Sequence, residues 1–390
     1  MLRLETAGES HGQCLLAVLS GLPAGVPVSL EAIDRDLRRR QQGYGRGQRM
    51  KIEQDRAEII AGVRHGRTIG APVAILIRNR DWAQWEEALP VENPPEAQAA
   101  HRPLTRPRPG HADLAGALKY NLTDARYVLE RASARETAAR VAAGALAKIL
   151  LREFDIEVRS HVVAVGSVRL QRRVSWDELV ALARRQEVVL ACVDAEVEQR
   201  MKQVVDEALH NGDTVGGVFE VVARGVPPGL GSCANWDRRL DGRLAQAVVS
   251  IQAVKGVEIG DAAQAAASFG SQVQDPIHYD PARRRFFRSS NHAGGIEGGI
   301  SNGEDVVVRG WLKPISTLRR PLESVDLVTR QPVAAAYERS DVCVVPAAAV
   351  VAEAMVAFVL ADAFLEKFGG DSLAETRRNY QGYLEQLDRF

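Results

Sequence analysis

Two stretches of the sequence are apolar around most of a helical circumference, and they constrain the fold more than any other feature. Residues 131–151, RASARETAARVAAGALAKILL, lie in a mostly helical region from Ala112 to Phe154, and the run from Val342 to Leu365 is the most apolar part of the chain. A helix without a polar face is buried rather than exposed on a surface. Because strands are interleaved with these helices, we expect a single α+β unit in which buried helices pack against sheets.

Local signals predict the other elements. Residues 1–30 alternate short apolar runs with Gly and Pro, which is typical of strands and turns. Residues 81–110 contain six prolines and two tryptophans, and a loop of that length in a compact protein is usually functional or disordered. Pro346 is suited to open a helix that Gly369-Gly370 ends, which leaves a charged tail over 369–390 after one domain over 1–368. We also predict helices over 31–42, 194–209 and 241–255, and strands over 71–77 and 306–311.

Composition excludes several classes of protein. Fifty basic and 50 acidic residues give a net charge of zero, whereas a general nucleic-acid-binding domain is usually basic. The four cysteines form no CxxC and are too few for a disulfide framework, which favours a reducing compartment. The N-terminus lacks the apolar run of a signal peptide, and Glu353 and Asp362 interrupt the apolar run after Val342. We therefore expect a cytoplasmic protein with no membrane span and no nucleic-acid partner.

Standard catalytic motifs are scarce. The chain has no P-loop, no HExxH and no dinucleotide-binding fingerprint, and its eight histidines lack metal-ligand spacing, so we predict no metal site. The segment from Gly8 to Gly12, GESHG, fits the G-x-S-x-G nucleophile elbow, which needs a strand before it and a helix after it. Only seven residues precede the motif, and Gly21 and Pro23 interrupt the segment after it. A serine hydrolase built on Ser10 is one alternative function.

Arginine is the strongest chemical signal. Only seven of the 50 basic residues are Lys, and Arg residues gather in three segments, 38–51, 101–111 and 126–135. Arg offers a rigid fork that binds carboxylates and phosphates. Arg131 and Arg135 are four residues apart, so we predict that they share a helix face near its N-terminus, where an anion would relieve their repulsion. The pattern favours a small phosphorylated carboxylic acid as ligand; solvated basic faces, or a non-catalytic anion- or nucleic-acid-binding module, are the alternatives.

Ten motifs, taken together, resemble those of the chorismate synthase family and stand in the family's order from Gly8 to Asp341. Each motif is modest evidence alone, but ten in order cover nearly the whole chain. They are GESHG (8–12), RRRQQGYGRGQRMKIEQD (38–55), RPGHADL (108–114), ERASARETAARVAAG (130–144), GDTVGG (212–217), GVPPGLG (225–231), IQAVKGVEIG (251–260), NHAGGIEGGISNG (291–303), KPIST (313–317) and RSD (339–341).

The resemblance implies a fold and a reaction. The fold would be a β-α-β sandwich with helices packed between antiparallel sheets, assembled as a homotetramer. The reaction would be the 1,4-anti elimination of the C3 phosphate and a C6 hydrogen from 5-enolpyruvylshikimate 3-phosphate, which gives chorismate. It would require reduced FMN without net redox change. No segment remains for a flavin reductase, so we expect a monofunctional lyase that depends on an external reductase, with NADPH as an indirect reductant.

The resemblance also implies site residues, position by position. His11 would protonate or hold the reduced flavin, His111 would act as an acid toward the phosphate or substrate, and Asp341 would assist proton transfer at the flavin. The substrate or NADPH would contact Arg40, Arg46, Arg49, Arg108 and Arg135. FMN would contact Arg131, Ala132, Ser133, Gln252, Ala253, Gly298, Lys313, Pro314, Ile315, Ser316, Thr317 and Arg339.

The sequence departs from the family pattern at three positions. Ala132-Ser133 stands where two serines are common, which removes one hydroxyl. Glu338 replaces a glycine and would put a negative charge beside the pocket. Ala347 stands where an Arg is usual, so any role of that Arg is absent here. The three catalytic positions are all occupied by the family's residue types, so we expect activity.

Overall fold

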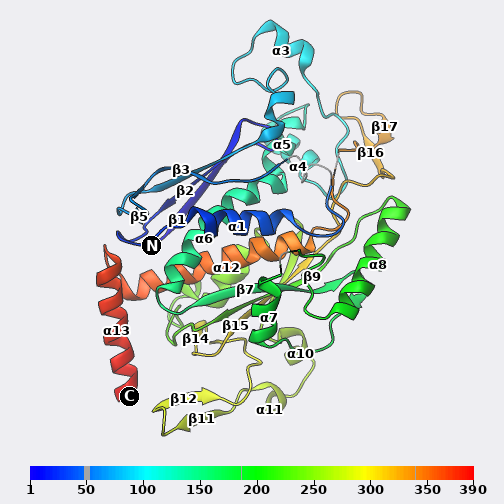
Figure 1. Cartoon of the computed structure of the whole chain (residues 1–390). Coiled ribbons are helices and arrows are strands. Elements are labelled where there is room, and N and C mark those ends of the chain that lie inside the picture. The colour runs from blue at the N-terminus through cyan, green and yellow to red at the C-terminus, as the bar shows by residue number, and fades with distance from the viewer. Residues whose placement is uncertain (48–52, 186, 339) are drawn as a thin grey trace.

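The computed structural model describes residues 1–47, 53–185, 187–338 and 340–390, without the side chains of residues 96–97. Two antiparallel sheets lie on either side of a layer of helices, as Figure 1 shows, with α6 and α12 crossing the middle of the molecule. This is the arrangement that the two apolar stretches require, because each central helix meets protein on every side. The expected α+β class and the β-α-β sandwich are confirmed.

The first sheet places a short loop at the edge of the site. Its strands β1 and β2 form a hairpin in which Gly8 pairs with Leu15, so residues 9–13 make the connection and carry His11. Gly8 has a φ of 96°, and a Cβ there would lie 2.2 Å from the Cys14 carbonyl oxygen, so a side chain cannot fit. The sheet order is β1 (Arg3–Gly8), β2 (Cys14–Ser20), β6 (Val73–Arg78) and β3 (Glu58–Ala61), beside the small ribbon of β4 (Val63–Arg64) and β5 (Arg67–Thr68).

The central layer consists of α1 (Leu30–Gln41), α6 (Thr137–Arg152) and α12 (Val345–Phe368). Helix α12 is 24 residues long, and by length and composition it would pass for a membrane span, yet 94% of its 18-residue apolar stretch is buried inside the protein. It packs on α6 so closely that a Cβ on Gly144 would lie 2.4 Å from the Cβ of Ala354. A small residue is therefore needed where the two helices cross.

The second sheet packs on α12 through its strands β7 and β9. Strands β7 and β9 pair along almost their full length and contact α12, while β15 and β10 extend the sheet on the other side. The order is β10 (Val254–Ile259), β15 (Val306–Leu312), β9 (Gly217–Arg224), β7 (Glu157–Val165) and β8 (Val168–Arg169); α7 (Trp176–Ala183), α8 (Ala195–Asn211) and α9 (Leu240–Val249) lie around it.

Short elements connect and cap these layers. The Pro-rich region includes η1 (Arg80–Gln84) and α3 (Pro95–Ala100), which projects at the top of Figure 1, and leads into α4 (Asp113–Tyr120), α5 (Arg126–Ala132) and η2 (Ala134–Glu136). The others are η3 (Trp236–Arg238), α10 (Ala262–Ala266), α11 (Gly270–Val273), the ribbons β11 (Ile277–Asp280) with β12 (Arg285–Arg288), β13 (Ile296–Glu297) with β14 (Ile300–Ser301), β16 (Glu323–Val325) with β17 (Pro332–Ala334), and α13 (Leu373–Arg389).

A buried ionic network ties the central helices together. Glu353 of α12 is 1% exposed and binds Arg39 of α1 through both carboxylate oxygens, at 2.7 and 2.8 Å. Lys148 of α6 bonds both Glu353 and Asp36, and Ser160 of β7 donates to Glu353 at 2.8 Å. Burial opposes ionisation of Glu353, but Arg39 and Lys148 outweigh it and hold the pKa of Glu353 well below its ordinary value. The network fixes α1, which carries Arg40 toward the site.

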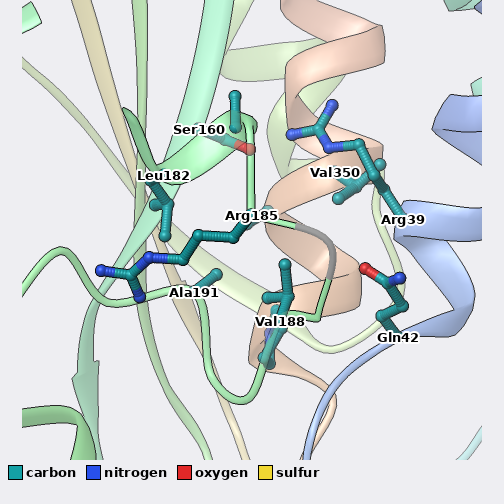
Figure 2. Close-up of a pocket in the computed structure, with 11 residues that line it drawn as sticks. Arg39, Gln42, Ser160, Leu182, Arg185, Val188, Ala191 and Val350 are labelled. Carbon is teal, nitrogen blue, oxygen red and sulfur yellow. The ribbon is translucent and has the colours of Figure 1, made fainter. Parts of the chain in front are cut away.

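A small cavity of about 40 Å³ adjoins this network. Figure 2 shows some of the residues that line it, among them Arg39 of α1, Val350 of α12 and Arg185 of the chain after α7. Ligand pockets are usually roughly 300–1,000 Å³, so this cavity has room for ordered water but not for a substrate. Since Arg39 and Ser160, two of its lining residues, already bind Glu353, the cavity belongs to the core.

The element predictions are mostly confirmed. The helices predicted over 31–42 and 194–209 and from Pro346 to Phe368 are present within a few residues of their expected ends. The helix predicted over 241–255 is wrong at its end, because α9 stops at Val249 and the chain enters β10 at Val254, where pairing with β15 outweighs helix propensity. The charged tail forms α13, whose Tyr380 packs on Phe364 and Phe368 of α12.

Candidate active site

Asp55 joins two arginines that are far apart in sequence. Its carboxylate accepts from Arg40 at 2.8 Å and from Arg135 at 2.6 Å, and these two side chains are 4% and 2% exposed. Burial opposes ionisation of Asp55, but the two guanidinium groups outweigh it and hold the pKa of Asp55 below its ordinary value. Asn79 accepts from Arg135 at 2.9 Å and completes the support. Two of the predicted anion-binding arginines therefore form one buried cluster.

This arginine cluster has donors to spare. The Nε of Arg40, the Nη2 of Arg135 and the Nε of Arg46 are buried without a hydrogen-bond acceptor among the described residues. The Nη2 of Arg135 lies 3.7 Å from Glu53 Oε2, which is beyond hydrogen-bond distance. Burial lowers the pKa of Arg40, and Arg135 and Arg46 lower it further, although Asp55 opposes them. Buried N–H groups without acceptors are costly, so an oxyanion bound here would satisfy donors that the protein leaves open.

Asp341 lies beside this cluster through Arg46. Its carboxylate accepts from the Nη1 of Arg46 at 2.9 Å and from the backbone N–H of Gly47 at 2.5 Å. A Cβ on Gly47 would lie 3.1 Å from the Ser340 carbonyl oxygen, which leaves little room for a side chain. Ser340 donates to the Thr317 carbonyl at 3.2 Å. Asp341 and its neighbour Ser340 therefore link the basic loop to the segment 313–317.

His111 is held by a buried carboxylate. Its Nδ1 lies 2.5 Å from Asp113 Oδ1, and Asp113 also accepts from Arg108 Nε at 2.8 Å. Burial opposes ionisation of Asp113, but the hydrogen bonds from His111 and Arg108 outweigh it and hold the pKa of Asp113 far below its ordinary value. Arg108 also donates to Thr317 Oγ1 at 2.9 Å. A carboxylate that accepts from Nδ1 leaves Nε2 as the nitrogen that can exchange a proton with a ligand.

His11 is held in the same way by a different carboxylate. Its backbone N–H donates to Glu130 Oε2 at 2.7 Å, and its Nδ1 lies 2.9 Å from Glu130 Oε1. The imidazole ring packs on Trp85 with centroids 4.3 Å apart. Ser10 donates to Ser133 at 3.1 Å, so one of the predicted flavin contacts lies next to this histidine. His11 is 13% exposed and Glu130 is 3% exposed, so the pair is largely shielded from water.

Thr6 of the first sheet and Glu136 of η2 connect two of the predicted flavin residues, Arg131 and Gln252. Arg131 donates to Thr6 Oγ1 at 2.8 Å, Thr6 donates to Glu136 at 2.8 Å, and Gln252 donates to Glu136 at 3.3 Å. Gln252 Oε1 is buried without a hydrogen-bond partner among the described residues. Thr6 and Glu136 also line a cavity of about 450 Å³, which is within the usual size of ligand pockets.

The segment 313–317 completes this side of the site. Ala253 adopts a left-handed φ of 69°, unusual without glycine, and its carbonyl accepts from the Lys313 backbone at 3.0 Å. Lys313 Nζ donates to Ser316 at 3.0 Å, and partial burial together with Lys255 lowers the pKa of Lys313. A Cβ on Gly110 would lie 3.3 Å from Ser316 Oγ, so the loop that carries His111 touches this segment. The Pro314 carbonyl accepts from Lys313 Nζ, and the Ile315 carbonyl accepts from Thr214 Oγ1.

The structure does not bring every predicted residue into these clusters. Gly298 lies in the turn between β13 and β14, where its carbonyl accepts from Arg239 at 3.0 Å; no contact joins it to another predicted flavin residue among those described. Arg49 and Arg339 lie outside the described residues. Ala132 ends α5, and Ala347 is buried in the first turn of α12.

One prediction about local geometry is wrong, and one alternative function gains no support. Arg131 and Arg135 do not share a helix face, because α5 ends at Ala132 and Arg135 lies in η2, where it turns inward to Asp55. The GESHG motif is not a nucleophile elbow, because strand β2 comes after it instead of a helix. Ser10 is 2% exposed and bonded to Ser133, which gives no support to a serine nucleophile.

Comparison with known proteins places this geometry in a family. The chain matches the family model for chorismate synthase over residues 2–365. The chain belongs to the chorismate synthase family. It is 72% identical over 390 residues to a chorismate synthase of Solibacter usitatus and 56% identical over 391 residues to that of Symbiobacterium thermophilum, with all of each chain covered. A crystal structure of chorismate synthase is 43% identical, with a TM-score of 0.79 and coverage of 100% of this chain and 99% of the other. The family resemblance is confirmed.

Carboxylates are the functional residues that sequence reasoning missed. Asp55, Asp113, Glu130 and Glu136 each hold a predicted site residue. All four stand inside motifs that are notable for their Arg and His residues, so the signal is present in the sequence, but the motifs alone do not show which side chains these carboxylates hold. Glu338, expected to place a negative charge beside the pocket, pairs with Arg126 Nη2 at 2.9 Å.

Proposed function

We propose that this chain converts 5-enolpyruvylshikimate 3-phosphate to chorismate and phosphate by 1,4-anti elimination, with reduced FMN as cofactor. The observation that carries the proposal is the arginine cluster around Asp55, whose buried donors without acceptors suit an oxyanion. It connects through Asp341, Ser340 and Thr317 to the Arg108–His111–Asp113 group. The substrate carries one phosphate and two carboxylates, and fixed cations are needed to bind such a ligand away from water. The family and its named relatives support the same reaction.

The chain's own charged residues would have distinct roles in this reaction. Arg40, Arg46 and Arg135 would bind anionic groups of the substrate and stabilise the charge that develops on the departing phosphate. His111 would supply a proton from Nε2, because Asp113 holds Nδ1. Asp341, fixed by Arg46 and Gly47, would orient a proton acceptor near the substrate.

The residues around Thr6 and Glu136 fit a flavin. Arg131 and Lys313 are cations suited to its phosphate, and the unpartnered Gln252 Oε1 is an acceptor for a ring N–H. The adjoining cavity of about 450 Å³ has the size of a ligand pocket. Reduced FMN, when bound, supplies electron density that eases the loss of phosphate. Gly298 contacts no other predicted flavin residue among those described, so its place at the flavin is proposed from the family resemblance alone.

We further propose a monofunctional, cytoplasmic homotetramer that receives reduced flavin from an external reductase, with NADPH as the indirect reductant. Exposed Ile277, Tyr279 and Phe286 on the β11–β12 ribbon support self-association, because exposed apolar side chains in a group mark contact surfaces. Four unpaired cysteines support a reducing compartment. Analytical ultracentrifugation tests the assembly: the tetramer has four times the chain mass of 42.5 kDa.

The reaction is tested by mixing the purified protein anaerobically with chemically reduced FMN and 5-enolpyruvylshikimate 3-phosphate, and following chorismate absorbance. Chorismate formation would support the reaction and its cofactor. A parallel reaction with oxidised FMN and NADPH should give none without an added reductase. A folded protein that binds FMN but forms no chorismate would refute the proposed function.

A further inference from the structure

Glu130 makes an unusually complete set of contacts with His11. Its Oε2 accepts from the His11 backbone N–H at 2.7 Å, and the ring Nδ1 lies 2.9 Å from Oε1 and 3.1 Å from Oε2. The Ser10 N–H also donates to the Glu130 backbone carbonyl at 2.9 Å. One buried residue of α5 therefore fixes both the backbone of the β1–β2 loop and the ring that the loop carries.

These contacts determine which ring nitrogen bears the proton. A carboxylate oxygen accepts hydrogen bonds, so an Nδ1 atom within reach of both oxygens must donate. In the neutral ring the lone pair is then on Nε2, on the far side of Cε1 from Glu130. The tautomer is thus set by a hydrogen bond to the nitrogen that does not react, as in other histidines held by a carboxylate.

Aromatic packing restrains the remaining freedom of the ring. The Trp85 indole lies against His11 with centroids 4.3 Å apart and an interplanar angle of 33°. Trp85 is itself 8% exposed, and two cations lie over its ring, Arg102 at 4.6 Å and Arg126 at 5.2 Å from the centroid. Arg126 Nη1 also lies 3.8 Å from Glu130 Oε1, which places a positive charge beside the carboxylate.

We propose that Glu130 is the positioning residue of His11, holding the ring in the Nδ1–H tautomer so that Nε2 exchanges a proton with the bound ligand. The catalytic consequence rests on the proposed function, whereas the tautomer is a property of the ligand-free protein. Glu130 itself would not touch the reacting atoms.

Glu130→Gln makes the proposal testable, because the Gln amide has one oxygen that accepts and one NH₂ group that donates. The His11 backbone N–H is always a donor, so it must face the amide oxygen, which turns the amide NH₂ toward Nδ1. Nδ1 then has to accept, and the proton moves to Nε2. Glu130→Asp keeps two accepting oxygens on a shorter side chain, and Glu338→Gln removes the other carboxylate partner of Arg126 without touching His11.

The measurement is solid-state ¹⁵N NMR of the ligand-free enzyme labelled at histidine ring nitrogens, with the His11 signals assigned by their loss in His11→Gln. We expect a protonated Nδ1 in the wild type, in Glu130→Asp and in Glu338→Gln, and an unprotonated Nδ1 in Glu130→Gln. Turnover should fall about 10²–10⁴-fold in Glu130→Gln and recover substantially in Glu130→Asp.

An unprotonated Nδ1 in the wild type would overturn the proposal without the need for any variant. An unchanged tautomer in Glu130→Gln, or the same turnover loss in Glu130→Gln and Glu338→Gln, would overturn it as well. If the tautomer changes as expected but no variant or wild type forms chorismate, the positioning role stands and the proposed function fails.

Discussion

Removing the charge that joins the two buried arginines should destabilise the protein more than any exposed ion pair could. In Asp55→Asn, the amide keeps the size of the side chain but replaces an accepting oxygen with a donor. Arg40 and Arg135 approach that group at 2.8 and 2.6 Å and are 4% and 2% exposed, so a neutral water molecule is a poor replacement for the lost charged acceptor. Breaking such a buried pair costs about 3–5 kcal/mol, a large part of the roughly 5–15 kcal/mol that keeps a domain folded.

The assay is urea unfolding of the ligand-free protein at neutral pH, followed by tryptophan fluorescence and by circular dichroism. Glu58→Gln is the matched control, because Glu58 forms a comparable bidentate pair with Arg78 at 2.8 and 3.2 Å, but on the surface. We expect the control to leave the unfolding midpoint nearly unchanged. Inorganic phosphate should raise the midpoint of Asp55→Asn more than that of the wild type, because the variant lacks the anion that the two arginines share.

Equal effects of Asp55→Asn and Glu58→Gln would refute the reasoning. That result would mean that water or a side-chain rearrangement satisfies Arg40 and Arg135, so that burial in this cluster does not determine its energetics.

Other parts of the structure lead to three further predictions. Gly144→Ala should cost about 1–3 kcal/mol through the clash with Ala354, whereas Gly382→Ala in the open helix α13 should gain up to about 1 kcal/mol; equal unfolding midpoints would contradict the close packing of α6 on α12. Because the pKa of Glu353 is depressed in the folded state, its contribution to the free energy of unfolding is complete above its ordinary pKa of 4.5 and is lost as pH falls further. Glu353→Gln should therefore make the free energy of unfolding depend less on pH in this acid range, and an unchanged dependence in urea unfolding at several acid pH values would count against the prediction. Asp113→Asn and His111→Ala should each lower turnover by about two orders of magnitude or more in steady-state assays, and near-wild-type rates in either would remove the His111 group from the mechanism.

The central helices were predictable because their signals are local. Pro346 and Gly369 mark the ends of α12, and the absence of a polar face predicts burial whatever the partner. The end of α9 was not predictable in this way. Its continuation, residues 251–255, turns through the left-handed Ala253 and joins β15, a partner some 50 residues further along the chain, so pairing rather than propensity decides its structure.

The motifs predict the cations and histidines of the candidate site but not the residues that hold them. Arg40 and Arg135 are predicted to bind anions from their motifs, yet their common neighbour Asp55 belongs to neither helix. Nothing in a linear pattern indicates which of 50 acidic residues will meet a given arginine, because that choice is made by packing. The same holds for Glu130 and His11, which are 119 positions apart and meet only when α5 reaches the β1–β2 loop.

The late position of α12 in the chain affects the order in which the protein can form during synthesis. Residues 345–368 fill the space between two sheets that are complete by Leu312. Until the ribosome has delivered them, the face of the second sheet formed by β7 and β9 and one side of α6 lack the partner that α12 provides. The helix itself emerges with the length and composition of a membrane segment. If the second sheet formed before α12 had been synthesised, the space that α12 occupies would be empty. The apolar side chains of β7 and β9 that face α12 would then stay exposed until residue 368 has been added. Such an intermediate is prone to aggregation and is the kind of client that chaperones protect.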